Sequence, residues 1–329
     1  MKVSVGMITY NMAKYIEEAL QSVLCQKEYI DELVICDDVS TDDTVSKAQS
    51  ILENSGFDGW KIVRNEHNLG NRKNAVKCYS ECCTGDVIIV ADPDDIAYPD
   101  RFKTLIEKFS DPEVCMAFSN ATVFFDDDTV TFPLWKNLGV SYDEIKNQDG
   151  YNKKILKRFV VSGCTMAFTK KLIQSCSNVN EKCAWDMWLA WNAPFFGKCV
   201  AIDRELVRYR QHSNNDSGTA RKKKGSGRFG RLNKLLKCVK SPINKWFFDT
   251  NLFGACLVEL KEGLPDTNEK LKAGFLYAIE FYQNILSLDS LKKSERLKIL
   301  KKAWNNGSYA TYRGGKMQYS LDRLNVLLH

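Results

Sequence analysis

Short runs of apolar residues alternate with amphipathic stretches over the first hundred residues. Buried parallel strands have a nearly continuous apolar pattern, because helices cover both faces of their sheet. We therefore expect four parallel strands, at the runs rich in β-branched side chains that span 3–8, 32–36, 60–64 and 87–91.

The stretches between these runs have the period of helices. Residues 13–25 place apolar side chains on one face, and 71–82 form a further helical stretch. Ser40 and Asp43 have the spacing of a capping box, which predicts a helix that runs toward Leu52. Strands that alternate with helices predict an α/β fold with a doubly wound sheet.

Polar residues follow each of the four predicted strands. Doubly wound sheets bind ligands outside the carboxyl ends of their strands, so these residues are the first candidates for a functional site. They are Thr9, Tyr10 and Asn11 after the first strand, Asp37 and Asp38 after the second, Asn65, Asn68, Gly70 and Asn71 after the third, and Asp92, Asp94 and Asp95 after the fourth.

The rest of the chain has a mixed and then a helical pattern. Residues 114–125 predict one bent strand or two. A basic, glycine-containing stretch at 221–231 has the composition of a linker. We therefore predict an α/β domain over 1–220 and a helical region over 221–329. The other expected elements are strands at 164–168 and 199–202 and helices at 185–191, 232–239, 252–260, 271–286 and 297–304.

The composition is that of an ordinary globular protein. Of the 329 residues, 44% are hydrophobic and 27% are charged, which argues against a disordered or fibrous chain. The twelve cysteines include no Cys-x-x-Cys pair, so a zinc site is not expected. The first apolar run is too short for a signal peptide, and the uncharged run 114–125 is too short to span a bilayer. We expect a cytoplasmic protein with reduced thiols.

The net charge of +6 comes from one segment. Residues 221–248 contain ten lysines and arginines and no acidic residue, whereas the rest carries 37 basic and 41 acidic residues. A basic amphipathic helix in this segment favours the surface of an anionic membrane. A helix that packs its leucine face on the α/β domain is the alternative. The apolar face has Leu232, Leu235, Leu236 and Val239, and Lys234, Lys237 and Lys240 lie beside it.

Three carboxylates, Asp92, Asp94 and Asp95, crowd the end of the fourth predicted strand. Like charges this close repel one another and raise one another's pKa, and a divalent cation offsets the repulsion. Because Mg²⁺ prefers carboxylate oxygens and substrate phosphates, the pattern favours a metal that holds a nucleotide diphosphate. A solvated acidic loop is the alternative, and we interpret 126–128, three aspartates without strand-end partners, as such a turn.

Four segments in order resemble the nucleotide-binding half of family 2 glycosyltransferases of the GT-A fold. They read VSVGMITYN, ELVICDDVSTDDT, NLGNRKNA and TGDVIIVADPDDIAYPDR. The resemblance continues through SGCTMAF, WDMWLAW and YRQHSNNDSG, and the last of these is similar to the bacterial rhamnosyltransferase-like branch that builds capsule and O-antigen. It covers about 1–220 and leaves the last third unmatched.

The resemblance implies an inverting hexosyltransferase or deoxyhexosyltransferase. The donor would be a UDP-, dTDP- or GDP-sugar, and the cofactor Mg²⁺ or Mn²⁺. The acceptor would be a glycan hydroxyl on a lipid-linked chain at the inner face of the cytoplasmic membrane, where the protein would be peripheral. The implied donor-binding residues are Thr9, Tyr10, Asn11, Asp37, Asp38, Asn68, Gly70, Arg72, Lys73 and Asp92. The implied metal site includes Asp92, Asp94, Asp95 and His212, and which carboxylate ligates directly stays open. The implied acceptor side has Ser162, Gly163, Cys164, Trp185 and Trp188.

Asp186 occupies the position of the catalytic base in this resemblance. An attacking sugar hydroxyl must lose its proton, and a carboxylate within hydrogen-bond reach accepts it. Tryptophans at 185, 188 and 191 would raise the pKa of Asp186 and offer faces for a sugar to stack on. The alternative is that Asp186 solvates a helix whose tryptophans belong to the core. We do not expect Cys164 to be a nucleophile, since no basic neighbour is evident in the sequence.

Two other classes of protein compete with a glycosyltransferase. A nucleotidyltransferase or a dinucleotide-binding oxidoreductase could use a similar sheet, but the chain lacks both Gly-x-Gly-x-x-Gly and the phosphate-binding loop motif. A nucleic-acid-binding protein could use the basic segment. It would bind RNA or DNA with a steep salt dependence and would not turn over nucleotide sugars. We expect no nucleic-acid partner.

Overall fold

The computed structural model describes residues 1–126, 131–212, 228–242, 252–313 and 315–329. The chain divides into two compact units, one of 1–154 and 159–219 and the other of 155–158 and 220–329. The boundary expected between 220 and 221 lies outside the described residues.

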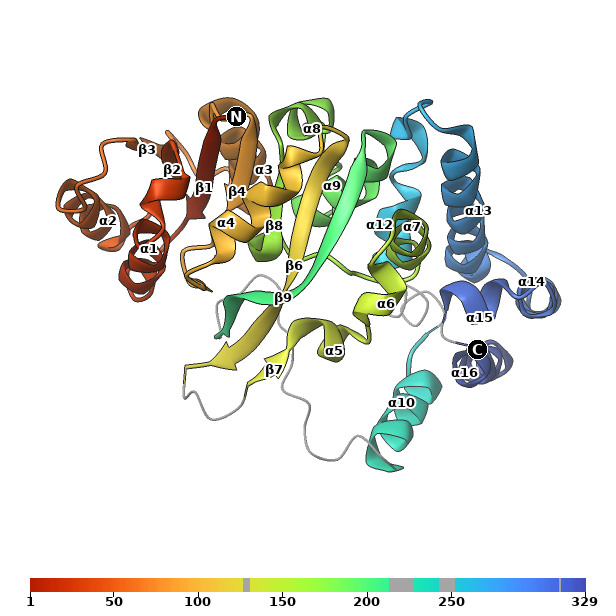
Figure 1. Ribbon diagram of the computed structural model, residues 1–329. Helices are drawn as coiled ribbons and strands as arrows, with labels where there is room; N and C mark the ends of the chain where they lie inside the picture. Colours follow the sequence, from red (N-terminus) through yellow and green to blue (C-terminus); the bar gives the residue numbers. More distant parts are fainter. Residues whose placement is uncertain (127–130, 213–227, 243–251, 314) are drawn as a thin grey trace. The chain divides into compact units, whose positions relative to one another are not determined.

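A mixed β-sheet forms the centre of the first unit (Figure 1). Over the described residues it has nine strands in the order β3-β2-β1-β4-β8-β6-β9-β5, and β7 pairs with β6. The strands are β1 (Val3–Thr9), β2 (Glu32–Asp37), β3 (Trp60–Arg64), β4 (Val87–Val90), β5 (Ile96–Ala97), β6 (Val114–Phe125), β7 (Phe132–Pro133), β8 (Met166–Thr169) and β9 (Lys198–Gln211).

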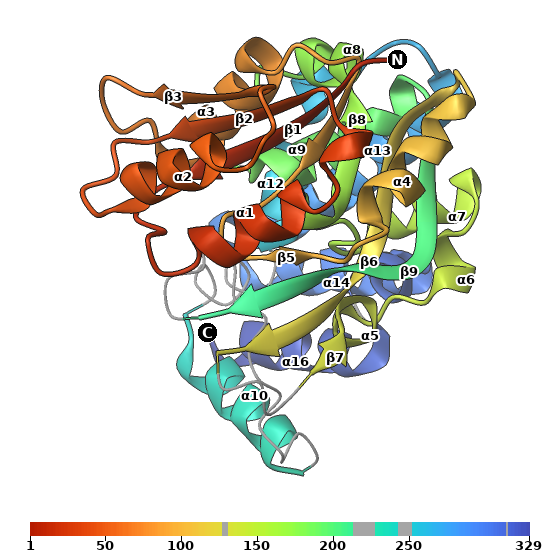
Figure 2. The same cartoon turned by 60° about the vertical axis from the view of Figure 1, so that its left-hand side comes forward.

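Helices cover both faces of the parallel half of this sheet. In Figure 2, α1 and α2 lie side by side on the face of β1 and β2 turned to the viewer, and α3 lies behind. Right-handed crossovers produce this arrangement, because the chain moves outward from β1 to β3 and then returns across the sheet to β4. The helices are α1 (Ile16–Leu24), α2 (Thr44–Glu53), α3 (Gly70–Lys77), α4 (Arg101–Ile106), α5 (Leu134–Leu138), α6 (Tyr142–Ile145), α7 (Gln148–Ile155), α8 (Lys170–Ser175) and α9 (Trp185–Asn192).

The four strands predicted from apolar runs are confirmed, and they pair in parallel. Every residue of β1, β2 and β4 is buried, as expected for strands covered on both faces. Because these strands run in one direction, their carboxyl ends meet at one edge of the sheet, where the polar residues that follow them gather.

The predicted capping box is wrong. Helix α2 begins at Thr44 after Asp43, which makes no side-chain capping bond. The Ser40 hydroxyl instead donates to Asp37 Oδ1 at 2.5 Å. The Ser40 side chain is therefore bound to Asp37, at the end of β2, and does not cap α2.

The mixed pattern after residue 114 folds into two long neighbouring strands. Residues 114–125 form one strand, β6, whose pairing with β9 contains register shifts near Ser119 and Asn120. Such irregularities bend a strand, which explains why the pattern suggested one bent strand or two. Strand β9 extends to Gln211, far beyond the predicted 199–202, and runs beside β6 along its length (Figure 2).

The second unit is helical. The four predicted C-terminal helices are confirmed, although the stretch expected to be a linker is already helical from Arg228 onward and its 221–227 part lies outside the described residues. No helix within the described ranges is long and apolar enough to cross a membrane. The helices are α10 (Arg228–Lys240), α12 (Leu252–Val258), α13 (Glu269–Leu286), α14 (Lys293–Asn305), α15 (Ser308–Tyr312) and α16 (Gly315–Leu328).

Candidate active site

The carboxylate of Asp37 ties together the loops that follow β1 and β2. It is fully buried and accepts hydrogen bonds from Thr9 Oγ1 at 3.1 Å and from the Ser40 backbone N–H at 3.0 Å. Asn11, in the left-handed region with φ 54°, accepts a hydrogen bond from the Thr41 N–H at 2.8 Å. These residues shape the edge of the sheet and leave Tyr10, which is 47% exposed, facing solvent.

Asp38 holds the loop that opens α3. Its carboxylate accepts hydrogen bonds from the backbone N–H groups of Leu69 at 2.7 Å and Gly70 at 2.8 Å, and from the Asn65 amide at 2.8 Å. Gly70 has φ +77°, a conformation that L side chains rarely adopt. The structure thus gives Asp38 a part in positioning the 68–70 loop.

Two other residues of this segment, Asn68 and Lys73, are exposed. The Asn68 amide nonetheless turns back to the loop, where it donates to the Asp38 carbonyl at 3.1 Å and accepts from the Gly70 N–H at 3.1 Å. The Arg72 guanidinium donates a hydrogen bond to the Glu181 carbonyl, and its Nη2 lies 3.9 Å from a carboxylate oxygen of the same residue. The predicted nucleoside-binding segment is therefore accessible, but Arg72 already has a partner.

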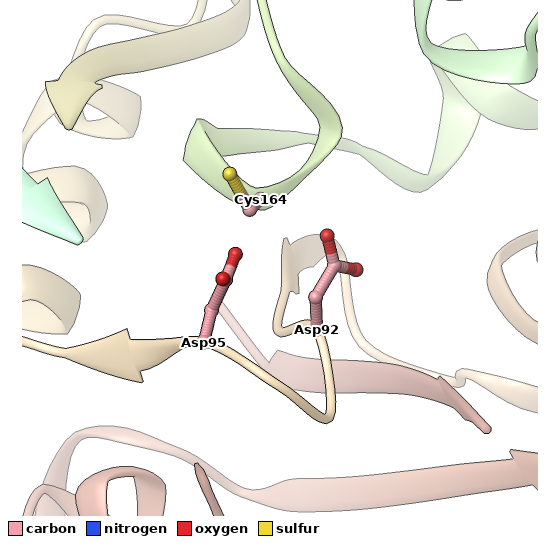
Figure 3. Close-up of side chains that lie close together, drawn as sticks. All are labelled: Asp92, Asp95 and Cys164. Carbon is pink, nitrogen blue, oxygen red and sulfur yellow. The ribbon is translucent and has the colours of Figure 1, made fainter. Parts of the chain in front are cut away.

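The acidic cluster after β4 brings Asp92 and Asp95 toward Cys164, which comes from the turn before β8. Figure 3 shows the three side chains around a common space, and their ligand atoms lie within 4.8 Å of one another. Burial and the negative charges of Asp94 and Asp92 raise the pKa of Asp95 well above its usual range. Asp95 Oδ2 is buried and has no hydrogen-bond partner at ordinary geometry within the described part of the chain. A hard divalent cation such as Mg²⁺ fits the two carboxylates of this group, since it would offset the repulsion between them and give Asp95 Oδ2 a partner. The Cys164 thiol is not a ligand that such a cation prefers.

Asp94 points to a different neighbour. Its Oδ2 lies 2.9 Å from His212 Nε2, and the His212 ring stacks on Tyr15 with centroids 4.6 Å apart. The four residues predicted for the metal site therefore fall into two groups, Asp92 with Asp95 and Asp94 with His212.

Arg210 is a site residue that the sequence analysis missed. Its backbone N–H donates to Asp95 Oδ1 at 2.8 Å, and its Nε donates to the Asp94 carbonyl at 2.9 Å. Its guanidinium also donates to Glu18 and lies 3.4 Å from Asp126 Oδ1. Residues two positions apart on a strand point to the same side, so a β9 expected to continue to Gln211 would have predicted that Arg210, and His212 just after the strand, face the acidic cluster.

The interpretation of 126–128 as an unpartnered turn needs a correction. Asp126 lies in a turn, but it directly follows β6 and is bound by Lys14 at 2.8 Å as well as by Arg210. The β6–β9 pairing brings these residues together, and the sequence alone gave no sign of that pairing. Residues 127 and 128 lie outside the described residues.

Arg101, also missed, is fully buried behind the acidic cluster. Its Nη2 donates to the Val90 carbonyl at 2.6 Å and to the Cys164 carbonyl at 2.5 Å. It is therefore a basic neighbour of Cys164 that the sequence did not reveal. Even so, burial and the charges of Asp95 and Asp92 raise the pKa of the Cys164 thiol well above its usual range. A raised pKa disfavours the nucleophilic thiolate, and the expectation that Cys164 is not a nucleophile stays a prediction.

Asp186 lies in the first turn of α9, beside the same Gly163–Thr165 turn that carries Cys164. Its Oδ2 accepts a hydrogen bond from the Gly163 N–H at 3.0 Å, and its Oδ1 accepts one from the Met187 N–H at 2.8 Å. Loss of water raises the pKa of Asp186 to about 6, although these backbone bonds favour the charged form. A carboxylate with such a pKa is suited to general-base catalysis near neutral pH.

The tryptophans around Asp186 are largely buried. Trp185 is 6% exposed, Trp188 is 8% exposed, and Trp185 packs against Tyr79 with ring centroids 5.0 Å apart. A Cβ on Gly163 would lie 2.8 Å from Cζ2 of Trp185, so the indole fills the space beside this glycine. In this structure the rings leave little surface for a sugar. Their acceptor-binding role, like that of Ser162, stays a prediction.

Comparisons with known proteins identify the family and the fold. Residues 4–176 match the family model of glycosyl transferase family 2. The dTDP-rhamnosyl transferase RfbG of Shigella flexneri is 27% identical over 64% of this chain and 73% of its own length. The O-antigen chain rhamnosyltransferase RfbN of Salmonella typhimurium is 27% identical over 65% of this chain and 67% of its own. A Mycobacterium tuberculosis protein of unknown function, MT1568, is 37% identical, but the match spans only 38% of its length.

Two solved structures share the fold. S. aureus TarS 1–349 in complex with UDP-GlcNAc has a TM-score of 0.59 at 15% identity, covering 99% of this chain and 91% of its own. The mannosyltransferase PcManGT from Pyrobaculum calidifontis, in complex with GDP-Man and Mn²⁺, has a TM-score of 0.52 at 15% identity, covering 99% and 86%. At such identities the likeness concerns the fold alone. Because the family model matches more than half of the chain, this protein belongs to the family 2 glycosyltransferases and has their GT-A fold.

Proposed function

We propose that the protein transfers a sugar, with inversion, from a nucleotide-diphosphosugar to a hydroxyl of a glycan acceptor. The observation that carries the proposal is the place of the Gly163–Thr165 turn between two sets of carboxylates. Cys164 of this turn faces Asp92 and Asp95, and the Gly163 N–H binds Asp186. A site for a metal-bound diphosphate thus lies next to a carboxylate suited to act as a base.

The donor side of the proposed site is assembled from the strand ends. Mg²⁺ or Mn²⁺ held by Asp92 and Asp95 would stabilise the negative charge of the leaving diphosphate. The pairing of Asp94 with His212 fixes the carboxylate beside this position. Exposed Tyr10 and Lys73 are available to the nucleoside. Asp38 fixes the 68–70 loop that opens α3, and Asn68 donates to the Asp38 carbonyl.

Asp186 acts on the acceptor side in this proposal. It accepts the proton of the attacking hydroxyl as the bond to the anomeric carbon forms, and its pKa of about 6 leaves it mostly ionised at neutral pH. The relatives with rhamnosyl transfer in their names support a glycan acceptor and a deoxyhexosyl donor. Family membership favours this function over a nucleotidyltransferase, an oxidoreductase or a nucleic-acid-binding protein.

We also propose that α10 attaches the enzyme to an anionic membrane surface, where a lipid-linked acceptor would be found. One side of α10 packs on α16, since Cys238 is buried and its thiol donates to the Leu321 carbonyl at 3.0 Å. Three apolar side chains on other sides of the helix are exposed, Leu235 by 38%, Leu236 by 45% and Val239 by 41%. The exposed Lys234, Lys237 and Lys240 supply the positive charge that anionic headgroups attract.

Turnover of nucleotide sugars tests the proposed reaction. Purified protein should hydrolyse or transfer from at least one member of a panel of UDP-, dTDP- and GDP-sugars, and the activity should disappear in excess chelator and return with Mn²⁺ or Mg²⁺. Asp94→Ala should abolish turnover, while Asp203→Ala, which removes an exposed carboxylate of β9, should not. Full activity in chelator would refute the metal dependence, and inactivity toward the whole panel would refute the reaction.

A further inference from the structure

A pocket in the second unit has no role in the reaction proposed above. It lies between α14 and α16, which pack against each other (Figure 1), and its volume is about 460 Å³. Small-molecule sites in proteins measure roughly 300–1,000 Å³, so the pocket has room for a ligand. Its polar and aromatic lining consists of Lys298, Lys301, Trp304 and Asn305 of α14 and Tyr319 and Arg323 of α16.

Two aromatic rings form one wall of the pocket. The rings of Trp304 and Tyr319 stack with centroids 4.7 Å apart and planes 17° apart. The Arg323 guanidinium lies 5.7 Å from the centroid of the Tyr319 ring, one helical turn along α16. The wall is therefore apolar and held in place by both helices, and its edge carries a positive charge.

The remaining charge in the lining is also positive. Lys298 and Lys301 are exposed, no acidic residue lines the pocket, and neither lysine nor Arg323 forms an ion pair within the part of the chain that the structure describes. Helix α14 as a whole carries five basic residues and one acidic residue. Three cations without counter-charges around one concavity favour a ligand with more than one negative charge.

We propose that this pocket binds an anionic saccharide, a sugar unit that carries phosphate or carboxylate groups. The lysines and Arg323 would bind the anionic groups, the Trp304–Tyr319 wall would pack on the apolar face of a sugar ring, and Asn305 would hydrogen-bond to its hydroxyls. The choice of a saccharide among anionic ligands rests on the proposed function, since a glycan acceptor has to be held while its end reacts. The anion has two possible sources, an acidic glycan or the diphosphate of a lipid-linked one.

Direct binding to the full-length protein tests the inference. The probe is a fluorescently labelled oligosaccharide of hyaluronan, whose repeat contains glucuronic acid, and a dextran oligosaccharide of equal length is the uncharged control. We expect wild-type protein to bind the acidic probe and not to bind dextran. Binding of the acidic probe should weaken as the salt concentration rises. Lys298→Glu, Lys301→Glu and Trp304→Ala should each weaken binding by about tenfold or more. Lys302→Glu is the matched control, because Lys302 is exposed on the same helix but does not line the pocket.

Competition identifies the source of the anion. Displacement of the probe by a water-soluble prenyl diphosphate sugar supports a lipid-linked ligand, and displacement only by unlabelled hyaluronan oligosaccharide supports an acidic glycan. Equal binding of dextran, equal weakening by Lys302→Glu, or full displacement by inorganic phosphate alone would each overturn the inference. Tighter, pocket-dependent binding of single-stranded RNA would replace it with a nucleic-acid site.

Nucleotide-sugar turnover, measured on the same preparation, separates this inference from the proposed function. Normal turnover without probe binding refutes the pocket and leaves the reaction intact. Pocket-dependent binding without turnover of any donor refutes the reaction and leaves an anionic saccharide site in the second unit.

Discussion

Asp186 is the residue whose ionisation should set the pH dependence of transfer. Burial places its pKa at about 6, above the usual value for an aspartate, so the protonated and inactive form accumulates as pH falls through this value. We expect kcat/KM to rise with pH up to about 6 and then to level off. Initial rates over a pH series at saturating metal measure this profile. An acid limb near the pKa of an ordinary aspartate would contradict the assignment.

The conservative replacement Asp186→Asn keeps the shape of the side chain and removes the proton acceptor. Transfer should fall by about 10²-fold or more, and the acid limb of the pH profile should disappear. Donor affinity, measured by calorimetry with the nucleoside diphosphate, should hardly change. Asp203→Asn, at an exposed position of β9, is the control. Lost nucleotide affinity with normal transfer would make Asp186 a donor ligand or a structural residue.

Residue types at strand ends predicted part of the site, and the residues that support it could not be predicted. Asp92 and Asp95 were recognisable because they crowd the end of an apolar strand within a segment that resembles family 2 glycosyltransferases, whereas the crowding alone also fits a solvated acidic loop. Arg101 was not, since a single arginine after a proline-containing turn looks like a surface residue, and only tertiary packing buries it against the Cys164 carbonyl. The pairing of Asp94 with His212 likewise depends on contact between residues more than a hundred positions apart.

At the scale of elements, the Gly163–Thr165 turn connects the two halves of the proposed site, and Gly163 allows it to fit. A Cβ at this position would lie 2.8 Å from the Trp185 ring, so either the turn or the indole must shift in Gly163→Ala. The Gly163 N–H donates to Asp186, so a shift of the turn would displace this carboxylate. We therefore expect Gly163→Ala to lower the transfer rate by about tenfold or more. Affinity for the free nucleoside should hold, because the contacts around Asp38 do not involve this turn.

Gly274→Ala is the matched control for this substitution. Gly274 lies in α13 and a Cβ there would meet nothing within 4 Å, so the variant should match or slightly exceed the wild type in stability and keep its activity. Steady-state kinetics and thermal unfolding of both variants measure the difference. Normal transfer by Gly163→Ala would mean that the turn does not position Asp186.

Elements whose pattern repeats locally were predictable, and elements defined by distant pairing were not. The buried strands β1, β2 and β4 were evident from their apolar runs. Strand β9 was expected to be short, because Asp203, Arg204 and Glu205 interrupt its apolar residues, yet its pairing with β6 and β5 carries it on to Gln211. That extension brings Arg210 to the acidic cluster, which explains why the sequence analysis missed both together.

At the scale of the whole molecule, the proposed transfer site and the proposed binding surfaces lie in regions of opposite charge. The proposed transfer site is rich in carboxylates and lies entirely in the first unit. The ten basic residues at 221–248 belong to the second unit, as does the cationic pocket between α14 and α16. A negatively charged acceptor or membrane would therefore be attracted to the second unit, while the metal and the donor require the first.

Membrane attachment by α10 tests whether the positive charge of the second unit has a role in binding. Each basic residue close to an anionic bilayer contributes about 1 kcal/mol, so changing Lys234, Lys237 and Lys240 to Glu should lower the partition constant by about 10²-fold or more. Co-sedimentation with phosphatidylglycerol-containing vesicles measures this constant. Binding should weaken with salt and be absent on phosphatidylcholine vesicles.

The control for this triple variant has the same net charge. Changing Lys261, Lys270 and Lys302 to Glu alters three exposed lysines of the second unit that lie outside α10, and this variant should keep most of the binding. Leu236→Gln should weaken binding without any change in charge, because the exposed leucine would insert among the headgroups. If both triple variants lost binding equally, the attraction would come from net charge alone. If neither lost it, the exposed apolar residues of α10 would not be a membrane-binding face.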